Sequence, residues 1–253
     1  LDISKMIVAD IDGDGDREVI FGDGQWGAIH ALSLTSGEQL WFIDNPNHSV
    51  SSILVDDLNN DGKQDIAWGA GYTSSGEDGF YIHTVEDKAL QWSKVIESFS
   101  NAGIALADIN GNGSLDVVYS MNRSESFSVV DTQTGEHVLT DISKTTAWDR
   151  KAVLATAELF NDGKKYIISA GSHYYQGNVQ VFSPDTGEEL FKTELGDGDN
   201  VSVLKTHDIN GDGKLEIIVG NGADHTGSAG SFVRVINGQT GDVINRSPML
   251  SNY

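Results

Sequence analysis

Short apolar runs alternate with polar loops along the whole chain, and such runs are typical of β-strands. Each run is about four to six residues long, rich in β-branched and aromatic side chains, and bounded by turn-forming residues. The first runs are Met6–Ala9, Glu18–Phe21, Ala28–Leu32 and Gln39–Phe42. No stretch sustains the period of an amphipathic helix. The pattern therefore predicts an all-β protein of short strands joined by turns.

The same arrangement recurs about every 50 residues. An acidic loop follows the first run of each repeat, and the five loops begin at Asp10, Asp57, Asp108, Glu158 and Asp208, which are 47, 51, 50 and 50 residues apart. Tight turns such as Thr35–Glu38 contain glycine, which supplies the positive φ that a hairpin needs. Four antiparallel strands per repeat are typical of a β-propeller blade, which buries its faces against neighbouring blades. Stacked β-sandwiches are the alternative, but they predict less regular spacing.

Five repeats occupy the whole chain, so we expect one β-propeller domain over residues 1–253. The approximate repeats are 1–46, 47–97, 98–147, 148–197 and 198–253. Five blades can close a ring or can form part of a larger propeller, and the sequence leaves both open. Because the chain begins at Leu1 without a Met, we expect it to be part of a longer polypeptide.

The acidic loops place oxygen-bearing side chains at positions 1, 3, 5 and 9, with glycine at position 6. Alternate side chains of a tight loop can converge on one point, and Ca²⁺ takes about six to eight oxygen ligands. The carbonyl at position 7 can add another oxygen. The expected ligands in repeats one, two, three and five are Asp10, Asp12, Asp14, Asp16 and Glu18; Asp57, Asn59, Asp61, Lys63 and Asp65; Asp108, Asn110, Asn112, Ser114 and Asp116; and Asp208, Asn210, Asp212, Lys214 and Glu216.

Other metals and other calcium loops fit this pattern less well. Mg²⁺ prefers a small shell that keeps water, and Zn²⁺ would need Cys or His, which these loops lack. An EF-hand needs an acid at position 12, where this chain has Phe21, Trp68, Tyr119 and Val219.

The fourth loop departs from the pattern, because Phe160 and Tyr166 replace the ligands at positions 3 and 9. We therefore expect about four calcium ions, with the loop from Glu158 to Tyr166 empty or weak. Charge predicts an order of affinity among the complete loops. The first loop, with four carboxylates, should bind calcium most tightly, and the third, with only Asp108 and Asp116 charged, most weakly.

The overall charge excludes some partners. The chain has 16 Lys and Arg against 38 Asp and Glu, for a formal charge of −22, which opposes binding to nucleic acid or to anionic membranes. No apolar run approaches the length of a membrane-spanning helix, so we expect no membrane insertion. Cysteine is absent, so disulfides and thiolate metal sites are excluded.

The loop pattern D-x-[DN]-x-[DN]-G-x-x-[DE] between two apolar strands resembles the FG-GAP and VCBS-type repeats. That family includes blades of integrin α-chain heads, bacterial surface proteins and some polysaccharide lyases. The resemblance implies structural calcium, with the loops on one face of the propeller. It also implies an extracellular or cell-surface location, or a periplasmic one, in a bacterial protein, where millimolar calcium suits weak sites.

The loops between the second and third strands, and between blades, carry exposed aromatic and polar residues. We expect them on the face opposite the calcium loops, where they can stack on sugars or contact a protein. The candidates are Trp26, Tyr72, Trp148, Arg150, His173, Tyr174, Tyr175 and His225. The competing interpretation is that these aromatics fill gaps between blades.

Two functions follow. The favoured one is a non-catalytic binding or adhesion module with a carbohydrate or protein ligand, for which we assign no catalytic residue. The alternative is the catalytic domain of a polysaccharide lyase or hydrolase, in which Arg150 with His173 or His225 could neutralise charge and act as base.

Overall fold

The structure is a computed structural model that describes residues 3–24, 28–47, 49–70, 78–96, 101–121, 126–143, 153–173, 176–197, 199–223 and 232–248. All the regular secondary structure in these ranges is β-strand. Over the same ranges, no helix has the length and apolar character needed to cross a membrane.

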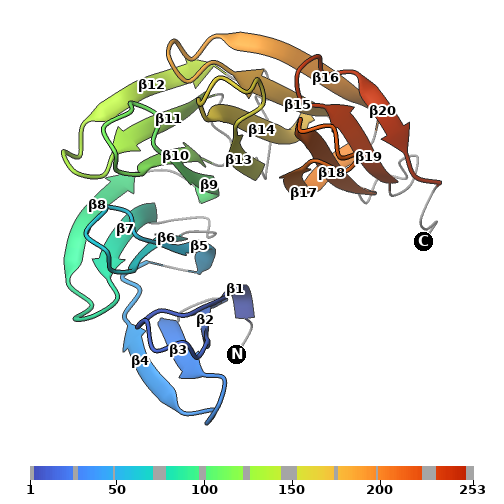
Figure 1. The fold of residues 1–253 in the computed structure, drawn as a ribbon. Coiled ribbons are helices and arrows are strands. Elements are labelled where there is room, and N and C mark those ends of the chain that lie inside the picture. Colours follow the sequence, from blue (N-terminus) through green and yellow to red (C-terminus); the bar gives the residue numbers. More distant parts are fainter. Residues whose placement is uncertain are drawn as a thin grey trace. The chain divides into compact units, whose positions relative to one another are not determined.

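The described strands form five four-stranded antiparallel sheets, and in each sheet the strands lie in chain order (Figure 1). The first sheet contains β1 (Ile3–Ala9), β2 (Glu18–Asp23), β3 (Ile29–Ser33) and β4 (Gln39–Ile43). The second contains β5 (Val50–Asp56), β6 (Asp65–Ala70), β7 (Asp78–Thr84) and β8 (Leu90–Ile96). The third contains β9 (Asn101–Ala107), β10 (Asp116–Met121), β11 (Ser126–Asp131) and β12 (His137–Ser143).

The fourth sheet contains β13 (Val153–Ala157), β14 (Tyr166–His173), β15 (Gln176–Phe182) and β16 (Glu189–Asp197). The fifth contains β17 (Asp199–His207), β18 (Glu216–Ala223), β19 (Phe232–Asn237) and β20 (Val243–Arg246). The acidic loops are the connections β1–β2, β5–β6, β9–β10, β13–β14 and β17–β18.

The described chain separates into two compact units, which we describe one at a time. Unit 1 comprises Leu1–Asn101 with the short segments Gly113–Leu115 and Thr132–Gly135, and unit 2 comprises the remainder. In unit 1, β5 packs against β1 and β2; in unit 2, β17 packs against β13, β14 and β15, and β13 against β10. The expectation of one domain with the repeat limits given above stays a prediction.

The second strands β6, β10 and β14 are buried on both faces, whereas buried and half-buried residues alternate along β2 and in β18. Successive side chains of a strand point to opposite faces. In β14, Ile167 packs in one core with Phe127 and Phe182, whereas the adjacent Ile168 packs in another with Val219 of β18. Both isoleucines are fully buried. This two-sided burial explains the continuous apolar runs that follow the acidic loops.

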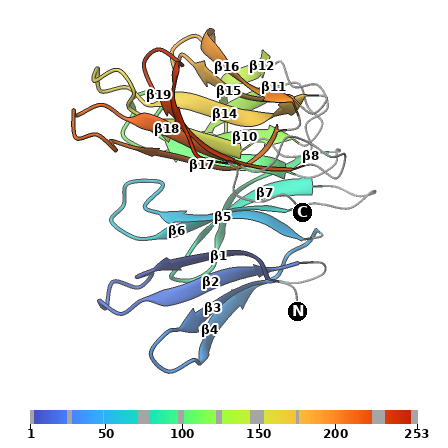
Figure 2. The same cartoon turned by 90° about the vertical axis from the view of Figure 1, so that its right-hand side faces the viewer.

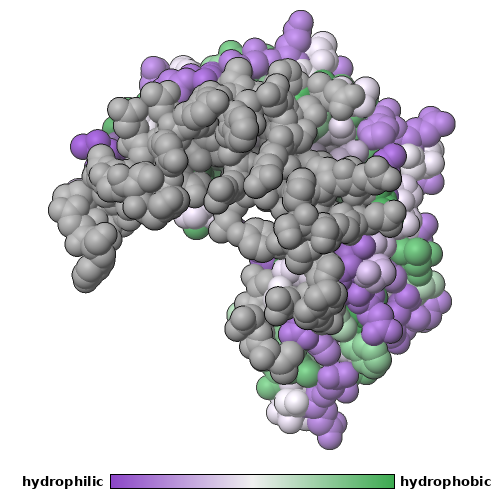
Figure 3. Space-filling view, turned by 180° about the vertical axis from the view of Figure 1, so that it is seen from behind, coloured by the Kyte–Doolittle hydropathy of each residue, from purple (hydrophilic) through white to green (hydrophobic). Residues whose placement is uncertain are grey.

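The surface is mainly hydrophilic where the described residues are visible in Figure 3, with smaller apolar patches between them. Exposed apolar side chains occur on the fourth strands, among them Leu40 of β4, Leu90 of β8 and Val243 of β20. Figure 2 shows the β1–β2 and β5–β6 loops of unit 1 extending from the same end of their sheets, as do β13–β14 and β17–β18 of unit 2.

Candidate metal centres

All five acidic loops share one backbone conformation. The residues at positions 4 and 6 have positive φ in every loop: Gly13 and Gly15, Asn60 and Gly62, Gly111 and Gly113, Asn161 and Gly163, and Gly211 and Gly213. Glycine and asparagine tolerate this region best, which explains why they occupy these positions. The loop is therefore tightly curled, and the side chains at odd positions can approach one another.

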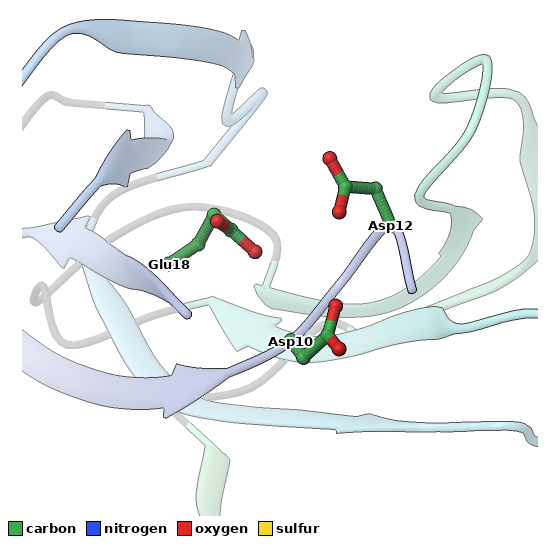
Figure 4. Close-up of side chains that lie close together, drawn as sticks. All are labelled: Asp10, Asp12 and Glu18. Carbon is green, nitrogen blue, oxygen red and sulfur yellow. The ribbon is translucent and has the colours of Figure 1, made fainter. Parts of the chain in front are cut away.

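The first loop brings three carboxylates together (Figure 4). One oxygen from each of Asp10, Asp12 and Glu18 lies within 4.8 Å of the others. Asp10, at the end of β1, accepts hydrogen bonds from the N–H groups of Gly13 at 2.8 Å and Gly15 at 3.1 Å. Glu18 begins β2 and is buried, while Asp12 is exposed. The cluster therefore joins the ends of two paired strands.

The acid at position 9 has the same role in each of the four complete loops. Its carboxylate accepts the backbone N–H of position 2 at 2.8–3.2 Å, in the pairs Ile11 with Glu18, Leu58 with Asp65, Ile109 with Asp116, and Ile209 with Glu216. All four acids are at most 3% exposed. A buried carboxylate is unfavourable unless it is paired or coordinates a cation.

Burial changes the proton affinity of two of these acids. Burial raises the pKa of Asp65, and the hydrogen bond from the Leu58 N–H only partly offsets it. Burial likewise raises the pKa of Asp116 to about 6, against hydrogen bonds from the backbone of Ile109 and Asn110. The ionised forms are therefore held in an environment that a nearby cation would stabilise.

The side chains at positions 1, 3 and 5 are also oriented by backbone donors. In the second loop, Asp57 accepts the N–H of Gly62 at 2.8 Å, Asn59 that of Asp61 at 3.0 Å, and Asp61 that of Lys63 at 2.9 Å. The fifth loop repeats these bonds, and those from the N–H groups of Gly213, Gly211 and Asp212 lower the pKa of Asp208.

The remaining expected ligands lie in the same loops. Asp14 accepts the N–H of Asp16, as Asp212 accepts that of Lys214, so position 7 follows the same course in these two loops. The side chain of Lys63 forms an ion pair with Glu86, and Ser114 is buried. The expected side-chain ligand atoms are all oxygens, the donor set that Ca²⁺ prefers, so the residues fit the ion chemically. Among the described residues, only the first loop brings three carboxylates within 4.8 Å of one another.

The fourth loop keeps the shared backbone with different bonds. Glu158 accepts the N–H of Gly163 at 2.9 Å, and the Tyr166 hydroxyl donates to Asp162 at 2.8 Å. Lys164 pairs with Asp185. Burial, and then this bond to Asp162, raise the pKa of Tyr166 to about 12, so the hydroxyl keeps its proton. The Tyr166 hydroxyl thus already occupies an oxygen of Asp162, and the expectation that this loop is empty or weak stays a prediction.

The expected ligand-binding residues fall almost wholly outside the described residues. These are Trp26, Tyr72, Trp148, Arg150, Tyr174, Tyr175 and His225. His173 ends β14, but its side chain is not described. The side chains of the alternative lyase pair, Arg150 with His173 or His225, are therefore not described either.

Two features of the described residues were missed by sequence reasoning. A cavity of about 730 Å³ in unit 1 adjoins the first loop, and its lining includes Asp10, Asp12, Trp41 and Lys63. Asp131, at the end of β11, bonds to the third loop although it lies outside the motif. Both depend on how distant segments pair, so no local pattern indicates them.

Comparisons with known proteins agree with this architecture. The chain is similar to the WD40 domain of Neurospora crassa Pan2, with 16% identity and a TM-score of 0.65 over 98% of this chain and 66% of that one. It is also similar to the WD40 domain of Toxoplasma gondii coronin, with 11% identity and a TM-score of 0.66 over 95% of this chain and 57% of that one. The chain thus spans less than two thirds of the length of these structures, and the likeness defines the class as β-propeller.

A family comparison refines that class. Residues 57–119 match the model of the FG-GAP-like repeat. This segment runs from the start of the second acidic loop into β10, the strand that follows the third acidic loop. No curated protein sequence matches the chain significantly. The predicted all-β propeller and its resemblance to FG-GAP-type repeats are both confirmed.

Proposed function

We propose that this chain is a calcium-stabilised, non-catalytic binding module of a secreted or cell-surface protein. One observation carries the calcium: each of the four complete loops ends in a buried carboxylate, whereas the fourth loop replaces that acid with a tyrosine. A buried carboxylate recurs at position 9 in four repeats with oxygen-bearing side chains around it, and a bound cation would stabilise it.

The chain's own residues prepare these sites. Backbone N–H groups hold the carboxylates at positions 1 and 9, so the loop is shaped before any ion arrives. Calcium would neutralise acids that otherwise repel one another at the junction between the first two strands. Its contribution is therefore to stability, because each loop ties two strands of one sheet together.

We further propose that the module contacts a carbohydrate or protein through the face opposite the calcium loops. The support is the set of aromatic and polar residues that the sequence places in the loops at the other ends of the strands, such as Trp26 and Trp148. In this proposal calcium stabilises the sheets, and the opposite face stays available to the ligand.

Calorimetric titration with Ca²⁺ and with Mg²⁺ tests the metal. We expect several Ca²⁺ sites with dissociation constants of roughly 10⁻⁴–10⁻³ M or tighter, weaker Mg²⁺ binding, and a lower melting temperature after chelation. An unchanged melting temperature in chelator at low salt would overturn the structural role.

An oligosaccharide array in millimolar calcium tests the ligand. Trp26→Ala and Trp148→Ala should abolish any binding while leaving the calcium titration unchanged. Release of unsaturated sugars from an acidic polysaccharide, removed by Arg150→Ala, would replace the non-catalytic proposal with the lyase.

A further inference from the structure

Asp131 is a buried carboxylate that lies outside the loop motif and contacts the third loop. It ends strand β11 and is 6% exposed. Its Oδ2 accepts hydrogen bonds from the side-chain Nδ2 atoms of Asn110 at 2.8 Å and Asn112 at 2.7 Å. These asparagines occupy positions 3 and 5 of the loop, so the contact joins β11 to two expected calcium ligands.

The strand register places Asp131 directly opposite Asp116, the buried acid at position 9. The corresponding partners in the other complete repeats are Ser33 opposite Glu18, Thr84 opposite Asp65, and Asn237 opposite Glu216. Among these four described pairs, only that of the third repeat joins two acids. The third loop is also the one whose position 5 is an amide instead of a carboxylate.

Two buried acids facing one another require compensation. Like charges directly opposite in an antiparallel sheet are destabilising, and burial of a carboxylate is unfavourable without a partner. Asp131 is among the charges that raise the pKa of Asp116. A divalent cation bound in the loop would stabilise both carboxylates at once.

The contact bears on which way the Asn112 amide points, because Asn110 takes its orientation from the loop itself, as Asn59 and Asn210 do. An asparagine binds Ca²⁺ only through its oxygen, and its amide can rotate to present either atom. A carboxylate accepts but does not donate, so Asp131 holds the nitrogens of Asn110 and Asn112. Asn110 Nδ2 also donates to Asp116 Oδ1 at 3.4 Å and its Oδ1 accepts the Asn112 N–H at 2.9 Å, so the amide that Asp131 orients is that of Asn112.

We propose that Asp131 is a positioning residue of the third calcium site, where it orients the Asn112 amide and supplies the third negative charge. This inference rests on the calcium binding proposed above. With Asp108, Asp116 and Asp131, the third site has three carboxylates, as many as the second and fifth loops contain. The third loop therefore binds calcium about as tightly as those loops, in place of the weakest binding that the motif alone predicts.

Two reciprocal, nearly isosteric variants of the full chain test this. Asp131→Asn removes the charge from the third repeat, and Asn237→Asp adds one at the same position in the fifth. Calcium is titrated into ¹⁵N-labelled protein, and the side-chain amides of Asn110, Asn112 and Asn210 report on each loop by nuclear magnetic resonance.

Asp131→Asn should raise the half-saturating calcium concentration of the third loop at least about tenfold and leave the fifth loop unchanged, because ligand charge tunes affinity over orders of magnitude. Asn237→Asp should lower that of the fifth loop. The urea midpoint of metal-free Asp131→Asn should equal or exceed the wild-type value, because one of two opposed buried charges is gone, and this separates positioning from a general loss of stability.

The outcomes separate the two proposals. Equal third-loop midpoints in wild type and Asp131→Asn overturn the role of Asp131 while calcium binding stands. Absence of calcium-dependent shifts in any loop of the wild type overturns the proposed function and this inference with it. If Asp131→Asn does not fold, Asn237→Asp decides, and an unchanged fifth-loop midpoint overturns the inference.

Discussion

Replacement of Glu18 should destabilise the protein in two ways that can be measured separately. Glu18 is 3% exposed and accepts the N–H of Ile11, which is itself 4% exposed, at 3.1 Å. Glu18→Ala leaves that N–H buried without its acceptor and also removes a carboxylate from the cluster with Asp10 and Asp12. Glu18→Gln keeps an oxygen for the N–H and removes only the charge.

The lost hydrogen bond and the lost calcium site lower the unfolding free energy by different amounts, and only the second depends on calcium. Leaving the Ile11 N–H unsatisfied costs about 2 kcal/mol of unfolding free energy, with or without calcium. Loss of one calcium site costs a further 2.7 kcal/mol or so when calcium is present at about 100 times its dissociation constant. Glu18→Ala should therefore lose about 5 kcal/mol in calcium and about 2 kcal/mol in chelator. Glu18→Gln should lose mainly the calcium-dependent part.

Urea denaturation followed by intrinsic tryptophan fluorescence, to which Trp41 and Trp68 of unit 1 contribute, measures these differences with calcium and with chelator. Tyr166→Phe is the control in the fourth loop, because it removes an exposed hydrogen bond and should change little in either condition. If Glu18→Gln matched the wild type in calcium, the first loop would not be a calcium site. If Glu18→Ala matched it in chelator, the hydrogen-bond argument would be wrong.

Three further changes test other parts of the structure. Phe160→Asn combined with Tyr166→Glu restores ligands at positions 3 and 9, so calorimetric titration should detect one more calcium ion than in the wild type. Gly22→Ala places a Cβ 2.3 Å from that of Val50, and should lower the stability of unit 1 by about 1–3 kcal/mol in urea denaturation. Thr156→Val removes a 2.7 Å hydrogen bond to a carbonyl of β9 and should lower the stability of unit 2 by about 1 kcal/mol by the same assay.

The strands and the acidic loops were predictable because each is a local property that the repeat shows five times. Glycine at position 6 follows from a positive φ, and the apolar residues after position 9 follow from burial on both faces of β6 or β14. A single loop would be ambiguous, whereas copies in register identify the positions that matter. The loop that breaks the pattern, from Glu158 to Tyr166, was identifiable for the same reason.

Other features depend on contacts between segments that the sequence does not align. Asp131 lies in the third strand of its repeat, and only the register with β10 brings it opposite Asp116. The bond from Tyr166 to Asp162 depends on the curl of the fourth loop, so substitution alone predicts the loss of a ligand but not what replaces it. Likewise, Trp41 lines the cavity beside the first loop because two sheets meet there.

The central claim is that the first, second, third and fifth acidic loops bind calcium and that the fourth is empty or weak. It is tested most directly by anomalous diffraction from crystals grown in calcium. We expect one peak in each of the loops that begin at Asp10, Asp57, Asp108 and Asp208, surrounded by oxygens at about 2.3–2.6 Å, and none in the loop from Glu158. Empty loops in saturating calcium, or a peak of equal height beside Tyr166, would contradict the claim.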